Sequence, residues 1–309
     1  MLIEVDPKTY SEFFRVDPHP FISEKFIELN RKKTEKIVRL IEKNADKPAI
    51  GFAAGIKNRV LQSPFSAPFG GFHFRNQNIY ISQIDSFINS LKEYITSQEI
   101  SGIELTLPPD IYHPSFNAKT INSLMRNGFT PNIPDITNWV DLLEFKGRFN
   151  QKNSREYYSQ AVRNGLHFDL ASDEREEKDI YELICNNRAK FGRPIYMTFN
   201  DVKEIDNLWP VDFFKVNTED GVLAASAIFY RSHPETGFAV FWGDSDEGRP
   251  LRAMDFLAFN LWSYYKKLGF KYLDMGISTE SGLPNEGLLR FKEAHDTVSS
   301  LRYKFTWKA

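Results

Sequence analysis

The sequence contains a single cysteine, Cys185, which excludes an intrachain disulfide and a zinc site built from several cysteines. It also lacks an excess of either charge, because 39 basic residues face 41 acidic ones, a formal net charge of −2. No broad basic surface is therefore expected to attract DNA or an anionic membrane. No apolar run reaches the roughly 18 residues that a membrane-spanning helix needs. Glu4 and Asp6 stand where a signal peptide would carry basic residues. We therefore expect a soluble, cytoplasmic protein without a membrane span.

Several catalytic motifs are also missing. The sequence has no phosphate-binding Gly-x-x-x-x-Gly-Lys-Ser/Thr, no Gly-x-Gly-x-x-Gly after a strand, no Gly-x-Ser-x-Gly and no His-Glu-x-x-His. These absences argue against nucleotide hydrolysis, dinucleotide-dependent redox chemistry, serine hydrolysis and zinc proteolysis. The six histidines are scattered, and none of them pair at the spacing of metal ligands, so we expect no metal site.

The length of 309 residues predicts two domains. Hydrophobic residues make up 41% and charged residues 26%, as in an ordinary globular protein with room for a core in each domain. The aromatic content of 15%, with 27 phenylalanines and 13 tyrosines, is unusual. Composition alone leaves open whether these rings fill a core or line a groove.

Hydrophobic periodicity predicts alternating helices and strands in both halves of the chain. In the first half, we expect one or two helices over 21–43, strands over 48–56, 103–107 and 137–144, and helices over 83–98 and 115–127. In the second half, Ser154 is expected to begin a helix to 164, and a second helix covers 174–191. Strands at 213–217, 222–231 and 237–242 precede the clearest helix, 250–268, where Pro250 suits the first turn. A strand over 272–276, a short helix near 288–293 and a last strand over 301–307 complete the order.

The closing segment has a distinctive order: a long helix, Leu-Gly-Phe (268–270), the strand Tyr-Leu-Asp-Met-Gly (272–276), a variable loop and Gly-Leu-Leu-Arg-Phe-Lys-Glu (287–293). This order resembles the end of the Fem (FemAB-like) aminoacyl transferases and of related GNAT-fold acyltransferases. The resemblance implies an α/β (α+β) fold of two tandem GNAT-like domains, each a mixed, mostly antiparallel central sheet flanked by helices. The polar and charged segment 146–155 predicts the linker, so we expect domains at 1–148 and 149–309. The resemblance implies that the last strand, about 299–308, packs on the first domain.

The resemblance also implies a function. A transferase of this kind moves an acyl or aminoacyl group from an activated donor to an amine by direct attack in a ternary complex. The donor would be an acyl-coenzyme A or a charged transfer RNA, and the acceptor a small-molecule or peptide amine. The alternative is a catalytically degenerate tandem domain that binds a peptide or a cell-wall precursor without turnover.

Three groups of residues are candidates for the site. Lys292, in the Phe-Lys pair that the resemblance places in the substrate channel, would neutralise a donor phosphate or a developing oxyanion; the alternative is a lysine on an exposed short helix. Asp274 and Tyr272, on one face of the preceding strand, are candidates to orient an amine or to carry a proton.

The donor's phosphates are assigned to the start of the 250–268 helix, at Gly248, Arg249 and Arg252, because a helix N-terminus and arginines both favour anions. The loop has one glycine and three nearby acids, unlike a coenzyme A loop, so two solvated arginines are the alternative. The acceptor is assigned to Arg188, Lys190, Arg193 and Tyr196, at the end of the 174–191 helix; ordinary capping of that helix by its cations is the alternative.

Overall fold

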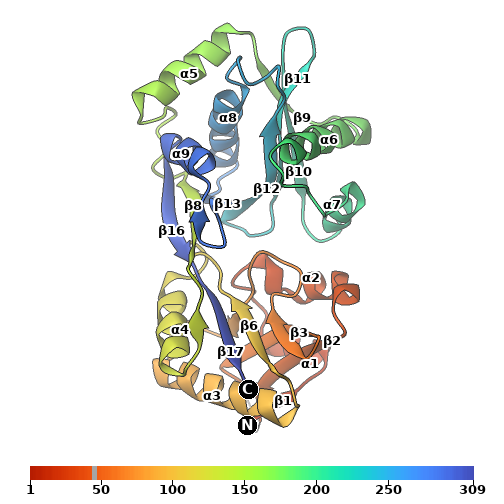
Figure 1. The fold of residues 1–309 in the computed structure, drawn as a ribbon, viewed down its shortest axis with the longest axis vertical. Helices are drawn as coiled ribbons and strands as arrows, with labels where there is room; N and C mark the ends of the chain where they lie inside the picture. The colour runs from red at the N-terminus through yellow and green to blue at the C-terminus, as the bar shows by residue number, and fades with distance from the viewer. Residues whose placement is uncertain (44–46) are drawn as a thin grey trace. The chain divides into compact units, whose positions relative to one another are not determined.

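The computed structural model describes residues 1–43 and 47–309. They form two compact units (Figure 1). Unit 1 comprises Met1–Ile136, Glu280–Leu283 and Ser300–Ala309, and unit 2 comprises Thr137–Thr279 and Pro284–Ser299. None of the described helices is long and apolar enough to cross a bilayer.

Unit 1 is built on a sheet with the strand order β1-β2-β3-β4-β6-β17-β7, and β5 pairs with β3. A core of aliphatic and phenylalanine side chains lies between this sheet and helix α3, which buries Phe87, Leu91 and Ile95. The elements are β1 (Leu2–Glu4), α1 (Pro7–Phe13), the 3-10 helices η1 (Pro20–Ile22) and η2 (Arg31–Lys33), α2 (Glu24–Leu29), β2 (Lys36–Glu42), β3 (Ile50–Lys57), β4 (Val60–Ser63), β5 (Phe72–Phe74), α3 (Ile81–Ser97), β6 (Gly102–Thr106), α4 (Pro114–Arg126), β7 (Thr130–Pro131) and β17 (Lys304–Lys308).

Unit 2 is built on a sheet with the strand order β16-β8-β13-β12-β11-β10-β9. Its elements are β8 (Asp135–Asp141), α5 (Lys152–Arg163), β9 (His167–Leu170), α6 (Glu174–Lys190), α7 (Phe199–Ile205), β10 (Val211–Asn217), β11 (Leu223–Tyr230), β12 (Thr236–Asp244), α8 (Ala253–Lys267), β13 (Tyr272–Ile277), α9 (Glu286–Ala294) and β16 (Thr297–Arg302). Two short strands, β14 (Thr279–Glu280) and β15 (Leu283–Pro284), pair with each other.

Helices α6 and α8 cover opposite faces of the unit 2 sheet (Figure 1). Side chains alternate along β11, so Phe229 packs with the α8 residues Trp262 and Tyr265, whereas the hydroxyl of Ser226 faces α6 and donates to the carbonyl of Ile180 at 3.1 Å. Both faces of the strand are therefore buried, as its apolar sequence predicts.

The two sheets repeat one arrangement. In unit 1, β4 and β6 are a parallel pair, and in unit 2, β12 and β13 are a parallel pair; each pair is connected through a helix. Antiparallel strands flank both pairs. The predicted mixed, mostly antiparallel sheets flanked by helices are therefore present in both halves. When the strand order of unit 2 is read in reverse, its parallel pair occupies the same place in the sheet as that of unit 1, which indicates a structural duplication.

Three expectations differ from the structure. Residues 137–141 belong to unit 2, because β8 pairs with β13 there, so the units divide at 136/137 rather than at 148. The segment 21–43, expected to be helical, ends in the strand β2, which pairs with both β1 and β3. The expected last strand over 301–307 is two strands, β16 and β17, and β17 pairs with β6 of unit 1.

Candidate functional site

The parallel strands β12 and β13 separate soon after they meet. They pair at only three positions, Thr236 with Tyr272, Gly237 with Leu273 and Phe238 with Asp274. Beyond Phe238, β12 continues to Asp244 with β11 as its strand neighbour, and within the described chain no strand covers its other edge. Residues 239–244, which we call the open edge, therefore present N–H and C=O groups that an extended ligand can pair with. At the end of this edge the carbonyl of Asp244 accepts from the Asn187 side chain at 2.8 Å.

A β-bulge interrupts the open edge. Ile228 of β11 pairs with Phe241, and Phe229 pairs with Ala239, so Val240 is an extra residue in β12. A bulge changes the direction of the strand and leaves backbone groups outside the ladder. It thus adds unpaired backbone groups where the two strands diverge.

The side chain of Lys292 lies beside the end of β13 and is 1% exposed, so the alternative of an exposed helix position is wrong. Its Nζ donates to the carbonyls of Gly276 at 2.9 Å and of Ile277 at 3.0 Å. Gly276 has a left-handed φ of 68°, which lets two successive carbonyls turn toward one amine. Burial lowers the pKa of Lys292 to about 7; the nearby carboxylate of Asp274 opposes this shift, and the charge of Arg188 adds to it.

Helix α9 links this lysine to the open edge. Phe291, the neighbour of Lys292, contacts Trp242 of β12 edge to face, with ring centroids 5.5 Å apart. Helix α9 therefore connects the C-terminal ends of the two strands. Phe291 contacts Trp242 of β12, and Lys292 forms hydrogen bonds with the carbonyls at the end of β13.

Asp274 and Tyr272 have different environments, although both lie on β13. Asp274 is 1% exposed, and its Oδ1 accepts from the N–H of Gly276 at 2.9 Å. It therefore acts electrostatically on Lys292 and holds the turn that supplies the lysine's acceptors. Tyr272 is half-buried and packs edge to face on Trp139, with centroids 5.4 Å apart. In the described part of the chain no hydrogen bond joins Tyr272 to Lys292.

The two arginines assigned to the donor phosphates already contact other side chains of the protein. Arg249 pairs with Asp244 at 3.1 Å and with Asp246 at 3.6 Å. Arg252 lies over the ring of Tyr157 at 3.8 Å and has a left-handed φ of 65° at the N-cap of α8. Because Arg252 has this left-handed backbone, residues 248–252 form a turn, and helix α8 begins at Ala253 and not at Pro250 as expected.

Gly248 is a steric requirement of this turn. A Cβ at this position would lie 2.0 Å from the carbonyl oxygen of Ala224. We expect Gly248→Ala to lower the free energy of unfolding by about 3 kcal/mol, measured by urea denaturation. The matched control is Gly287→Ala in α9, where the nearest atom would be 3.9 Å away. The control should be neutral or slightly stabilising; equal losses in both variants would contradict the steric assignment.

The residues assigned to the acceptor are not gathered in one place. Lys190 pairs with Asp246 at 2.5 Å, Arg193 is exposed, and the side chain of Tyr196 is 91% exposed. Only Arg188 lies close enough to Lys292 to affect its charge. The structure thus brings together Lys292, Asp274 and Arg188 from the sequence-based set.

Arg188 is a cation without an anion. Its guanidinium lies 5.9 Å from the ring centroid of Phe241 on the open edge, and its Nε is buried with no hydrogen-bond partner among the described residues. Burial, with a smaller contribution from the charge of Arg193, lowers the pKa of Arg188. Its own carbonyl accepts from the N–H groups of Phe191 and Arg193, so the end of α6 is capped by its backbone. The guanidinium is therefore left for another partner.

Sequence reasoning missed the open edge and the bulge at Val240. Strand divergence depends on which strands pair, and no local pattern reports it. Composition left the place of the aromatic rings open, and the structure shows that Phe241 contacts Arg188 and that Trp242 contacts Phe291. Among the described residues, no group of three or more histidine, cysteine or acidic side chains is arranged to hold a metal ion.

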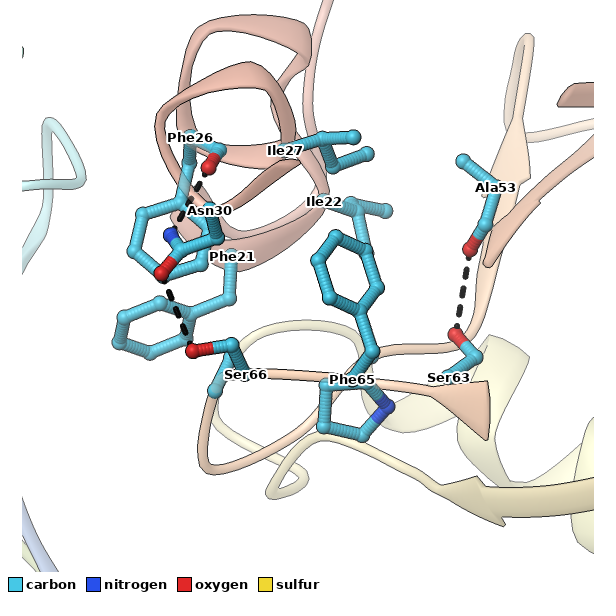
Figure 2. A pocket seen from close by; sticks show the side chains of 12 residues that line it. Phe21, Ile22, Phe26, Ile27, Asn30, Ala53, Ser63, Phe65 and Ser66 are labelled. Carbon is cyan, nitrogen blue, oxygen red and sulfur yellow. Dashed lines mark hydrogen bonds between the residues drawn. The ribbon is translucent and has the colours of Figure 1, made fainter. Parts of the chain in front are cut away.

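A small hollow in unit 1 offers no competing chemistry. Figure 2 shows its apolar walls and the hydrogen bonds among its polar groups. Asn30 donates to the carbonyl of Phe26 at 2.9 Å and accepts from the hydroxyl of Ser66 at 3.0 Å. Its lining contains no acid, base or thiol, so we assign no reaction to it.

Comparison with known proteins identifies the fold. No protein-family model and no curated protein sequence matches the chain. Solved structures do: FemX has a TM-score of 0.70 at 11% identity, over 100% of this chain and 97% of FemX. A tandem GNAT protein from the clavulanic acid biosynthesis pathway has a TM-score of 0.60 at 8% identity, over 100% and 98% of the two chains. L-PGS from Bacillus licheniformis has a TM-score of 0.58 at 13% identity, over 98% and 92%. The predicted fold of two tandem GNAT-like domains is confirmed.

Proposed function

We propose that the protein is an acyl or aminoacyl transferase that moves an acyl group from an activated donor to an amine in a ternary complex. The observation that carries the proposal is the buried amine of Lys292 beside the point where β12 and β13 diverge. FemX and the tandem GNAT protein, which share this fold, are consistent with it. Fold alone does not define a reaction, so the proposal depends on the residues at the open edge.

The open edge is proposed to bind the donor. An extended acyl arm laid along residues 239–244 would complete the missing strand and bring its carbonyl to the bulge at Val240. An unpaired N–H there would donate to the carbonyl oxygen as it becomes negatively charged during attack. The donor is thus held by backbone groups, which accept any acyl side chain of suitable size.

Lys292 is proposed to transfer the proton. A neutral amine has two hydrogens, which satisfy the carbonyls of Gly276 and Ile277 and leave its lone pair directed elsewhere. Its pKa of about 7 matches proton exchange near neutral pH. As the C–N bond forms and the bond from the acyl carbon to the leaving oxygen or sulfur breaks, the proton from the acceptor amine passes to Lys292 and then to the leaving atom.

Arg188 is proposed to bind an anionic group of the acceptor. Its half-buried guanidinium has no acidic partner among the described residues, and Phe241 places it at the open edge. Such a group would orient a small-molecule or peptide amine toward the donor carbonyl.

The donor is proposed to be a charged transfer RNA or an acyl-coenzyme A. The pairing of Arg249 with Asp244 and Asp246 removes one cation from the position where a coenzyme A diphosphate would bind. This favours the charged transfer RNA, which would need a local basic surface because the net charge is −2. The single free cysteine agrees with the reducing cytoplasm in which charged transfer RNA is made.

The test measures transfer from both donors to a panel of amines, with Arg188→Gln and Arg175→Gln as matched variants. Arg175 lies on the same helix, is exposed and forms no ion pair in the described chain. We expect product from one donor and a roughly tenfold higher KM for the acceptor in Arg188→Gln only. Saturable binding of the donors or amines without any product would instead establish a degenerate binding protein. Equal KM values in both variants would refute the role of Arg188.

A further inference from the structure

The C-terminal end of α9 is held by side chains from two other helices and the segment before one of them. A helix normally ends with carbonyls that lack partners within the helix. Here those carbonyls accept hydrogen bonds, at Phe291 from His295 Nδ1 (2.7 Å), at Glu293 from Gln151 (3.2 Å), at Ala294 from Ser154 (2.6 Å) and at His295 from Trp262 (3.0 Å). Ser154, expected to begin α5, therefore caps α9 instead.

His295 occupies the centre of this arrangement. Its ring is 2% exposed, and Nε2 lies 3.0 Å from Oδ1 of Asp255 on α8. Nδ1 lies 2.7 Å from the carbonyl oxygen of Phe291, so one ring nitrogen contacts α9 and the other contacts α8. His295 therefore ties the C-terminal end of α9 to α8.

His295 contacts the part of α9 that contains Lys292. The ring of His295 stacks on Phe291 with centroids 4.1 Å apart, and its backbone N–H donates to the carbonyl of Lys292 at 3.0 Å. Phe149 also packs edge to face on the His295 ring, with ring centroids 4.7 Å apart. The backbone of Lys292 is fixed on one side by His295, while its Nζ is fixed on the other by β13.

A second buried histidine of the chain also contacts a carboxylate. In unit 1, His73 lies 2.9 Å from the hydroxyl of Tyr10 and 3.0 Å from the carboxylate of Asp17. No contact joins His73 to α9 among the described residues, so the His73–Asp17 contact serves as a control for the His295–Asp255 contact.

We propose that His295, held by Asp255, is a positioning residue that fixes Lys292 against the carbonyls of Gly276 and Ile277. The inference concerns the placement of the amine, and only its effect on turnover rests on the proposed function. Asp274 on β13 and Arg188 on α6 are the charged groups that act on Lys292 from the neighbouring elements. Neither of them changes when the His295–Asp255 pair is broken.

The test follows the protonation of Lys292 by ¹⁵N NMR of the lysine Nζ in the intact protein, with Lys292→Arg to assign the signal. In His295→Ala, the amine loses its fixed position, and we expect its titration midpoint to rise by about one pH unit. His295→Gln, whose amide still donates to Asp255, should shift the midpoint less. Asp255→Asn keeps the shape of the site and serves if His295→Ala does not fold. The control is Asp17→Asn, which breaks the His73 pair and should leave the midpoint unchanged.

An unchanged midpoint in both His295→Ala and Asp255→Asn, with a lower melting temperature, would overturn the proposal and leave the pair with a purely stabilising role. The titration needs no substrate. A shifted midpoint in a protein that transfers no acyl group would therefore refute the proposed function and not the positioning role.

Discussion

Replacing Lys292 by methionine is expected to lower the turnover number by about a hundredfold to ten-thousandfold, the usual range for loss of a proton-transferring group. Methionine keeps the unbranched chain that is buried in unit 2, but it can neither accept a proton nor donate to the carbonyls of Gly276 and Ile277. The turnover number is measured with the donor that supports transfer, and circular dichroism verifies folding.

The matched control is Lys267→Met. Lys267 is the last residue of α8, it is exposed, and it forms no ion pair in the described parts of the chain. This variant should retain the turnover number of the unmodified protein. Equal activity in Lys292→Met and Lys267→Met would remove Lys292 from the mechanism, whatever the stability of the two variants.

The stability of the protein is expected to rise with pH between 7 and 9, and Lys292 is the reason. The pKa of its amine is about 7 in the folded protein, against 10.5 for an ordinary lysine. Between these values the unfolded chain binds one proton more than the folded chain, so raising the pH favours folding. Below pH 7 both states are protonated, and the destabilising effect of the buried charge is fully present.

The contribution of this group between pH 7 and 9 is roughly 2 kcal/mol in the free energy of unfolding. Urea denaturation of the unmodified protein and of Lys292→Met, compared at each pH, isolates it. Several buried tyrosines have pKa values raised by burial and act in the opposite direction at still higher pH, so the range stops at 9. A difference between the two proteins that does not vary with pH would show that Lys292 titrates normally.

Most of the strands and the long helices of unit 2 could be predicted, because they carry clear periods, whereas the short helix α7 was not expected. The helix expected within 21–43 was wrong over 36–42 for a physical reason. Strand β2 is buried on both faces, so its apolar residues do not alternate, and their spacing imitates a helix. Even Arg39 in this strand is buried, since it pairs with Glu24 and Glu28.

The candidate site was predictable only in part. The Phe-Lys pair indicated Lys292, but its burial depends on carbonyls 15 and 16 residues away, which only the folded strand brings to it. The ion pairs of Arg249 could have been predicted from the sequence, because Asp244 and Asp246 lie within five residues of it. That Arg188 forms no ion pair could not be predicted from the sequence, because it depends on which acidic side chains the fold places near its guanidinium.

Hydrogen–deuterium exchange at the open edge is the most direct test of the central claim, that β12 binds the donor where it separates from β13. Exchange is measured by mass spectrometry with and without charged transfer RNA, and again with acetyl-coenzyme A. We predict slower exchange in peptides covering 239–244 with the donor that supports transfer. Unchanged exchange in these peptides during productive transfer would contradict the account and place the acyl donor elsewhere in the protein.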